Sequence, residues 1–302
     1  MSVILESAAP EHISARWKDK PLLRYVFQPQ VPQRESPRPY FHPVFTLAGD
    51  TVTLYRPYDH PHHHGISMTC ANLSGQNFWG GPTYLRAENT YRDVPNWGTQ
   101  RHTGWAHLHN GTQPPVTIKE RLDWVTQAGA LWLEEERLIS VAEVNEAAGW
   151  WALDLCFNLR NVSGEELRWG SPTTENRPMA GYGGLFWRGP RSFHGGKILA
   201  GGGLQGPEVM SKRAPWLAYT GRHDETQGTS TLLFIDHPSN PRHPTQWFVR
   251  NADYAGVCAA FMFDQVYAHA PGDVLTLRYR VIVASGAWDA ARCDEQSRRV
   301  CA

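Results

Sequence analysis

The clearest alternation of apolar and polar positions lies in the middle of the chain. Three runs, at residues 116–125, 131–139 and 150–159, follow one another with short turns between them. Residues two apart on a strand share a face, so alternation of this kind predicts strands with one buried side. Because the first turn, at 127–130, contains a glycine, we expect three consecutive antiparallel strands.

The same pattern recurs on both sides of this region. Further strands are predicted at 45–48, 51–55, 230–235, 246–250, 257–263 and 274–283. The first two flank Gly49-Asp50, which predicts a hairpin with a tight turn. Only residues 289–300 have a helical pattern, and the 27 Gly and 22 Pro break the remainder into short elements. We therefore predict an all-β fold, a large antiparallel β-sandwich that forms a single domain over residues 1–302, with a short C-terminal helix in the tail at 287–302.

Composition and charge exclude several classes of partner. The 302 residues are 41% hydrophobic and include 13 Trp, enough for a sizeable core. Lys and Arg together number 29, as do Asp and Glu, and no basic run is interleaved with aromatic residues, so we expect neither a nucleic acid nor a membrane as partner. No apolar stretch approaches the roughly 18 residues of a membrane span, and the first residues lack a secretion-signal pattern, so we expect a cytoplasmic protein. Sheet edges that need covering leave a homodimer open.

The strongest chemical signal is the run Asp59-His60-Pro61-His62-His63-His64-Gly65. Histidine exchanges protons near neutral pH and also ligates metals. His62 and His63 are the leading candidates for acid/base catalysis. In an extended segment neighbouring side chains point to opposite faces, so we expect one of these two to enter the pocket, while His60 and His62 share a face. No cofactor is assigned, but the shared face leaves open a divalent or transition metal held by Asp59, His60 and His62.

Other polar and aromatic residues are candidates for contact with a small-molecule substrate. Glu175, in a loop before a glycine-rich turn, is the best distant carboxylate and the third catalytic candidate. Arginine forks bind hydroxyl or carboxylate groups, and tryptophan rings stack on the apolar faces of sugars. Residues 104–110 alternate, which places His107 and His109 on one strand face as a second pair for proton transfer or metal binding. The residues predicted to bind substrate are Arg38, Tyr40, His60, Trp79, His107, Tyr182, Arg188, His237, Asn240 and Trp247.

Six ordered blocks resemble one bacterial family. They lie at 38–43, 59–65, 77–79, 181–185, 236–247 and 277–281, within a matching region from about residue 37 to residue 286. On these blocks the chain resembles the PmoA-like family, also labelled methane oxygenase PmoA. That label implies a membrane subunit, which a chain with no expected membrane span contradicts, so we treat it as a misnomer. The resemblance implies a galactose-mutarotase-like supersandwich, a fold used by sugar epimerases, lyases and glycoside-processing enzymes. Where the family has Arg before the final glycine of the histidine run, this chain has His64.

Missing motifs narrow the function further. The chain has no GxxxxGKS, no GxGxxG after a strand, no GxSxG and no HExxH, which argues against nucleotide hydrolysis, Rossmann dehydrogenation, α/β-hydrolase chemistry and zincin proteolysis. We expect a carbohydrate-active enzyme that acts on a sugar, sugar acid or glycoside by His/carboxylate general acid/base catalysis, through mutarotation, epimerisation or elimination. Two alternatives stay open: a metal-dependent oxygenase or lyase that uses the histidine run, and a noncatalytic sugar-binding module.

Overall fold

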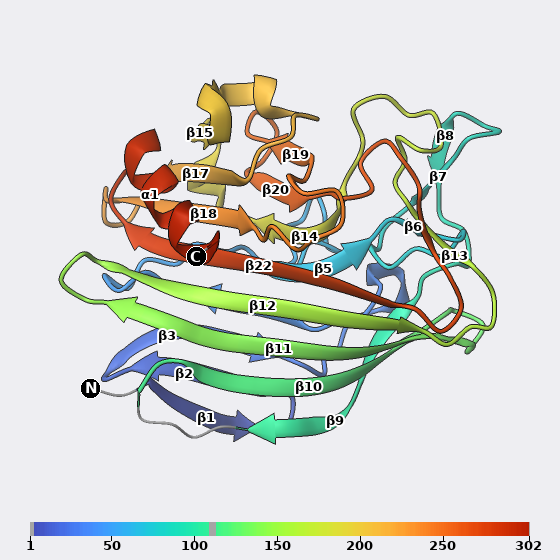
Figure 1. The fold of residues 1–302 in the computed structure, drawn as a ribbon, viewed down its shortest axis with the longest axis horizontal. Coiled ribbons are helices and arrows are strands. Elements are labelled where there is room, and N and C mark those ends of the chain that lie inside the picture. The colour runs from blue at the N-terminus through green and yellow to red at the C-terminus, as the bar shows by residue number, and fades with distance from the viewer. Residues whose placement is uncertain (1–2, 109–112, 302) are drawn as a thin grey trace.

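Two large β-sheets face each other and enclose the main hydrophobic core. The computed structural model describes residues 3–108 and 113–301, and Figure 1 shows the longer strands of one sheet in front of the other. The eight-stranded sheet has the order β1 (Val3–Ala9), β2 (His12–Trp17), β3 (Lys20–Val26), β4 (Tyr40–Val44), β5 (Ile66–Cys70), β14 (Gly183–Arg188), β20 (Gly256–Ala259) and β19 (Trp247–Arg250). The nine-stranded sheet has the order β16 (Leu204–Gln205), β15 (Lys197–Ala200), β17 (Trp216–Arg222), β18 (Thr229–Asp236), β22 (Val274–Ser285), β12 (Trp150–Asn161), β11 (Leu131–Asn145), β10 (Val116–Val125) and β9 (Thr99–Leu108).

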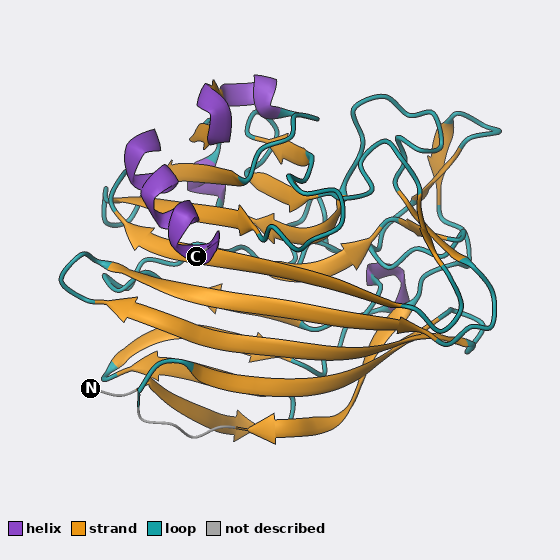
Figure 2. Cartoon of the chain, viewed as in Figure 1, coloured by secondary structure: helices purple, strands orange, loops and turns teal. Residues whose placement is uncertain are grey.

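Smaller elements complete the structure at the ends of the two sheets. One small sheet joins β21 (Tyr267–His269), β13 (Leu167–Gly170) and β6 (Asn72–Leu73), and a second joins β7 (Thr83–Leu85) to β8 (Thr90–Arg92). Four 3₁₀ turns are η1 (Gln33–Glu35), η2 (Arg191–Phe193), η3 (Gly201–Gly203) and η4 (Gly206–Val209). The helix α1 (Ala290–Cys301) lies on the outer face of the nine-stranded sheet (Figure 2). No helix within the described residues is long and apolar enough to cross a membrane.

Alternating side chains explain both layers of packing. On β12, Leu153 and Leu155 face inward and pack in the core between the two sheets. Trp150 and Ala152 on the same strand belong to a second buried cluster that also contains Cys293 of α1. Burying apolar area at about 25 cal/mol per Å² favours both arrangements, so the nine-stranded sheet is covered on one face and, in part, on the other.

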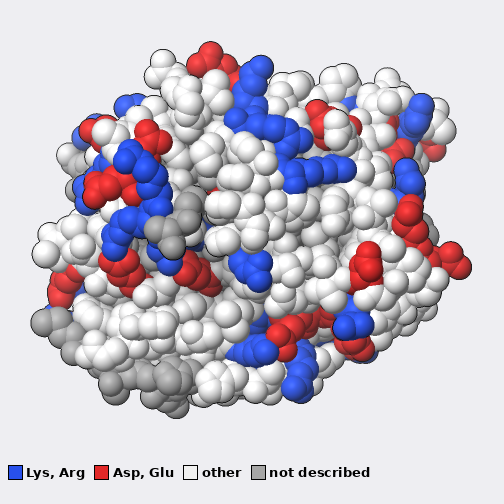
Figure 3. Space-filling view, viewed as in Figure 1, with Lys and Arg blue, Asp and Glu red and all other residues white. Residues whose placement is uncertain are grey.

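The predicted antiparallel sandwich with a C-terminal helix is confirmed. The strand predicted at 116–125 coincides with β10, which pairs antiparallel with β11, and β11 pairs antiparallel with β12. The helix expected at 289–300 is α1, displaced by one residue. Charges of both signs are interspersed over the face shown in Figure 3, in keeping with the formal net charge of zero.

Two strand predictions need correction. The hairpin expected at 45–55 is reduced to an isolated bridge between Phe45 and Thr51. After that bridge the chain passes the end of β14, where the backbone N–H of Leu54 donates to Arg188 O (2.9 Å). The strand expected at 257–263 ends at Ala259, since the following residues turn, with Phe263 N–H donating to Ala260 O (3.0 Å).

Candidate functional site

The histidine run forms tight turns rather than a strand. His60 N–H donates to Pro57 O (3.0 Å), and His63 N–H donates to His60 O (2.9 Å). Gly65 ends the run with φ +43°, where a Cβ would approach a backbone oxygen of β4 to 2.0 Å. The expectation that the run is extended and presents only one of His62 and His63 is therefore wrong, because both side chains line the same cavity.

A buried arginine supports the run from beneath. Arg38 is fully buried, and its guanidinium donates to the backbone oxygens of Glu35 and Ser36 (both 2.9 Å) and of His62 (2.7 Å). Burial lowers the pKa of Arg38 to about 9, which still leaves it charged at neutral pH. Arg38 does not line the cavity, so we assign it to the support of the loop instead of the predicted contact with substrate.

A second buried group fixes the end of the run. The Glu35 carboxylate accepts two hydrogen bonds from Arg56 (2.7 and 2.9 Å) and lies 3.1 Å from His64 Nε2. Burial lowers the pKa of His64 to about 4 although Glu35 opposes the shift, so this imidazole is neutral at physiological pH. Tyr40 stacks on Tyr55 at a ring-centroid distance of 4.8 Å and also packs near His64. Tyr40, predicted to bind substrate, thus lies in the supporting layer and not at the cavity.

The cavity above this support has a volume of about 450 Å³, large enough for a monosaccharide-sized ligand. Its lining combines three imidazoles, an aromatic wall and a charged rim. The imidazoles belong to His60, His62 and His63, the wall to Trp79, Tyr91, Tyr182, Phe248 and Tyr254, and the rim to Arg177, Arg250 and Asp253. Three predicted site residues other than His62 and His63 therefore line this cavity, namely His60, Trp79 and Tyr182. The imidazoles face an aromatic surface suited to sugar C–H groups.

Asp59 and His60 form a carboxylate–imidazole pair beside this cavity. Asp59 Oδ2 lies 2.7 Å from His60 Nδ1, while Arg188 and Arg191 donate to the same carboxylate at 3.0 and 2.5 Å. Partial burial acts to raise the pKa of Asp59, but hydrogen bonds from His60 and the two arginines hold it far below its ordinary value. An ionised carboxylate can only accept, so His60 carries a proton on Nδ1, and the neutral form of this ring has its lone pair on Nε2.

His63 has the opposite tautomer. Arg188 Nη1 lies 3.1 Å from His63 Nδ1, and since a guanidinium can only donate, the proton of a neutral His63 is on Nε2. Burial, with the neighbouring imidazoles, lowers the pKa of His63 well below its ordinary value and keeps the ring neutral. The rings of His60 and His63 stack at a centroid distance of 4.5 Å and 14°. Two adjacent rings thus offer one acceptor nitrogen and one N–H donor.

Arg188 positions these groups from behind. Its side chain is 1% exposed, and its guanidinium carbon lies 4.2 Å from the centre of the Tyr254 ring. Two of its nitrogens are occupied by Asp59 and His63, and it does not line the cavity. We therefore describe Arg188 as a positioning residue instead of the predicted substrate ligand.

His62 fits against two glycines. The His62 ring packs so closely on Gly81 that a Cβ there would lie 2.5 Å from the ring, and Gly80 is similarly close to the His62 Cβ. Both glycines have positive φ, at +95° for Gly80 and +66° for Gly81. Burial, followed by the nearby His60, lowers the pKa of His62 well below its ordinary value. These glycines therefore set the position of a neutral His62.

Replacing Gly81 with alanine is expected to displace the His62 ring and to cost about 2 kcal/mol in the free energy of unfolding. The cost arises from a Cβ clash combined with an unfavourable backbone conformation. Chemical denaturation measures it. Gly129→Ala is the matched control, because Gly129 also has positive φ (+91°) but a Cβ there meets nothing within 4 Å. Equal losses in the two variants would contradict a role for the His62 contact.

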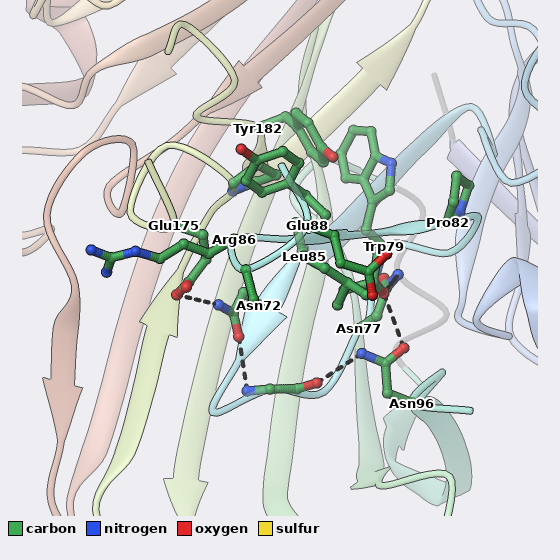
Figure 4. Close-up of a pocket in the computed structure, with 16 residues that line it drawn as sticks. Asn72, Asn77, Trp79, Pro82, Leu85, Arg86, Glu88, Asn96, Glu175 and Tyr182 are labelled. Atoms are coloured by element: carbon green, nitrogen blue, oxygen red, sulfur yellow. Dashed lines mark hydrogen bonds between the residues drawn. The ribbon is translucent and has the colours of Figure 1, made fainter. Parts of the chain in front are cut away.

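Glu175 lies in an adjoining cavity of about 400 Å³, which shares Trp79, Pro82 and Tyr182 with the histidine cavity. Figure 4 shows its carboxylate turned toward Asn72, whose Nδ2 donates to Glu175 Oε1 (3.0 Å). Trp79 and Tyr182 contact each other at a ring-centroid distance of 4.7 Å and contribute to both cavities. The structure therefore places the predicted carboxylate in the neighbouring cavity, and Asp59 is the carboxylate that contacts His60, a histidine that lines the histidine cavity.

The remaining predicted residues lie elsewhere. Trp247 is fully buried, with its indole N–H donating to Ala214 O (2.9 Å). Asn240 is buried and bonded to Asp236 (2.8 Å), which makes it part of a structural turn. His237 lines a different cavity, on the outer face of the nine-stranded sheet beside α1. His107 is an exposed residue of β9 and does not line the histidine cavity, while its expected partner His109 lies outside the described residues.

The lining residues that were not predicted include Tyr91, Arg177, Arg250 and Tyr254. They come from β8, the loop after β13, the end of β19 and the loop before β20. Arg250 is the last residue of a predicted strand, at the start of a loop, and functional side chains are often found on loops. The sequence offers no other indication of these four residues.

The metal-binding alternative finds no preformed ligand set. Among residues 3–108 and 113–301, no group of three or more His, Cys, Asp or Glu side chains is arranged to hold a metal ion. The Asp59 oxygens instead contact His60 and two arginines. The proposed ligands Asp59, His60 and His62 therefore do not converge on one point in this structure.

Comparison with solved structures finds sugar-processing enzymes at low similarity. An α-galactosidase from Lactobacillus brevis aligns with a TM-score of 0.43 and 9% identity, over 94% of this chain and 40% of that one. A GH36 α-galactosidase AgaA variant from Geobacillus stearothermophilus in complex with raffinose aligns with a TM-score of 0.37 and 10% identity over the same shares. The chain thus spans about two fifths of the length of these enzymes. Scores this low carry no argument about substrate or mechanism.

Sequence comparison identifies a family without a known activity. No curated protein matches the chain. One family model matches residues 12–298, which is nearly the whole sequence, and its description mentions neither a PmoA-like protein nor a methane oxygenase. The chain therefore belongs to the family described as "Family of unknown function (DUF6807)".

Proposed function

We propose that this protein is a carbohydrate-active enzyme that uses His60 and His63 as an acid/base pair. The observation that carries the proposal is the Asp59–His60 contact of 2.7 Å at the edge of an aromatic-lined cavity. Carboxylate-oriented imidazoles are effective general bases, and aromatic walls bind the C–H faces of sugars. The catalytic assignment thereby moves from His62 and Glu175 toward His60, with Asp59 as its orienting carboxylate.

The two tautomers suit reactions that move one proton off a substrate and another onto it. His60 Nε2 would accept a proton from a hydroxyl or an activated C–H, while His63 Nε2–H would donate to an oxygen. Ring opening of a hemiacetal, epimerisation next to a carbonyl and elimination of a glycoside all have this requirement. His62, neutral and packed on glycines, completes the imidazole surface.

Two further assignments belong to the same proposal. We infer that the PmoA-like group resembled by the sequence blocks and the matched family of unknown function are one group. We also infer that the sandwich is of the galactose-mutarotase-like supersandwich type. Neither assignment is needed for the functional argument, which depends on the cavity.

The test is turnover. Purified protein, treated with chelator, is incubated with a panel of aldoses, sugar acids and glycosides, and anomer exchange, epimers and unsaturated products are followed by proton NMR. Rate enhancement with at least one sugar supports the proposal. Saturable binding without any turnover would favour a noncatalytic sugar-binding module, and activity that appears only when a transition metal is restored would favour the metal-dependent alternative.

A further inference from the structure

Two arginines on the cavity rim have no carboxylate partner in the described part of the chain. The guanidinium carbon of Arg177 lies 4.7 Å from the ring centre of Tyr91, and that of Arg250 lies 4.6 Å from the ring centre of Phe248. Among the described residues, the hydrogen bonding of these two guanidinium groups is limited to a long contact from Arg250 Nη1 to Val249 O (3.4 Å). Stacking engages the face of a guanidinium and leaves its N–H edges available to another acceptor.

The neighbouring arginines are different. Arg188 and Arg191 share the carboxylate of Asp59, so their charges are already compensated at close range. On the cavity lining itself, Arg177 and Arg250 face a single acid, Asp253. His62 and His63 add no charge, because burial keeps both rings neutral by lowering their pKa values. The arginines and the acid of the lining therefore have a formal charge of plus one between them, in a chain whose formal net charge is zero.

We propose that Arg177 and Arg250 bind a carboxylate carried by the substrate, so that the substrate class is sugar acids such as hexuronates. This inference rests on the proposed function and specifies its substrate. A carboxylate presents two oxygens in a plane, which matches the fork of a guanidinium, and its single charge balances the cavity. A phosphate dianion would exceed that charge, so the charge of the lining favours a monoanion.

The aromatic wall provides the other half of the recognition. Trp79, Tyr182 and Tyr254 line the cavity together with both arginines. A pyranose ring can stack on an aromatic side chain while its carboxylate reaches the rim and its hydroxyls remain near the imidazoles. This arrangement requires the ring and the carboxylate to belong to one molecule, which distinguishes a sugar acid from a simple organic acid.

Binding is measured by isothermal titration calorimetry with matched sets of ligands. Each set contains a hexuronate, its methyl ester, the parent hexose and the hexose 6-phosphate, in the gluco and galacto configurations. The wild-type protein is expected to bind at least one hexuronate roughly 10- to 100-fold more tightly than its ester and its hexose, as expected for a charge-assisted pair of hydrogen bonds. Acetate should bind far more weakly than the preferred hexuronate.

Variants assign the preference to the two arginines. Arg177→Gln with Arg250→Gln is expected to abolish the preference for the hexuronate over its ester. The corresponding double lysine variant keeps the charge and should retain part of it. Arg222→Gln is the control for loss of a remote positive charge, because Arg222 is exposed at the end of β17 and does not line the cavity. Thermal unfolding of each variant confirms that the fold is retained.

The outcomes separate this inference from the proposed function. Equal affinity for hexuronate, ester and hexose would overturn the inference, as would tighter binding of the phosphate or an equal loss in Arg222→Gln. Binding of no sugar in either set would also overturn it. Turnover of neutral hexoses without any preference for the hexuronate would overturn the inference and leave the proposed function intact. A hexuronate preference that depends on the arginines, found without turnover, would support the inference and count against catalysis.

Discussion

Replacing His60 with glutamine is expected to lower kcat/KM for the sugar substrate by roughly 10²- to 10⁴-fold, with most of the loss in kcat. The glutamine amide can still donate to Asp59, so the loop keeps its principal contact. It cannot take a proton from the substrate, because an amide is not a base near neutral pH. Steady-state kinetics on the substrate found by NMR measures the loss.

Two companion variants distinguish catalysis from structural damage. His60→Gly leaves space for free imidazole, so added imidazole should restore part of the rate if the missing group is a proton acceptor. His194→Gln, at an exposed histidine that does not line the cavity, should keep full activity. Full activity in His60→Gln, or a loss in His60→Gly that imidazole leaves unchanged, would count against the assignment of His60.

The strands that could be predicted are those with two different faces. Alternate side chains of β10, such as Ile118 and Trp124, enter the core while their neighbours are more exposed, so the period of two is visible in the sequence. In β5 all five residues are buried, which removes the alternation, and that strand was not predicted. Two N-terminal strands were also missed. In β3 a register shift at Leu23/Tyr25 accompanies a broken alternation, whereas β2 alternates regularly between half-buried and buried residues and could have been predicted.

The candidate site was located by composition but not in its detail. A dense histidine run indicates a site wherever it lies, and its residues do line a cavity. The contact between Asp59 and His60 depends on the tight turns of the histidine run. These turns were not evident from residue types alone. The structural role of Arg38 depends on the backbone oxygens of Glu35 and His62, which only the folded chain places beside its guanidinium. Arg177 and Tyr254 come from separate loops, so no local pattern connects them.

Lowering the pH from 7 to 5 is expected to reduce the free energy of unfolding by roughly 4 kcal/mol. Burial holds the pKa of His64 at about 4 and those of His62 and His63 well below their ordinary values. Below about pH 6.5 the unfolded chain binds these protons and the folded chain does not, so stability falls as the pH falls. Each histidine contributes about 1.4 kcal/mol per pH unit in this window.

Buried acids oppose this trend in part. Burial raises the pKa values of Glu120 and Asp236, so the folded state gains protons at these groups as the pH falls and is stabilised by them. The lowered pKa of Asp59 acts only at more acidic pH, below the ordinary carboxylate range. Between pH 5 and 6.5 the three buried histidines outnumber the two buried acids, so the free energy of unfolding decreases as the pH falls.

Urea unfolding at half-unit intervals from pH 7.5 to 5 measures the predicted slope. His62→Gln removes one buried imidazole and is expected to make the slope shallower by about 1.4 kcal/mol per pH unit below pH 6.5. The exposed His194→Gln should reproduce the wild-type slope. A free energy of unfolding that stays constant from pH 7 to 5 would show that the cluster takes up protons without unfolding. In that case the buried imidazoles of His62 and His63 would be charged in the acidic range, and the donor role proposed for a neutral His63 would have to be replaced.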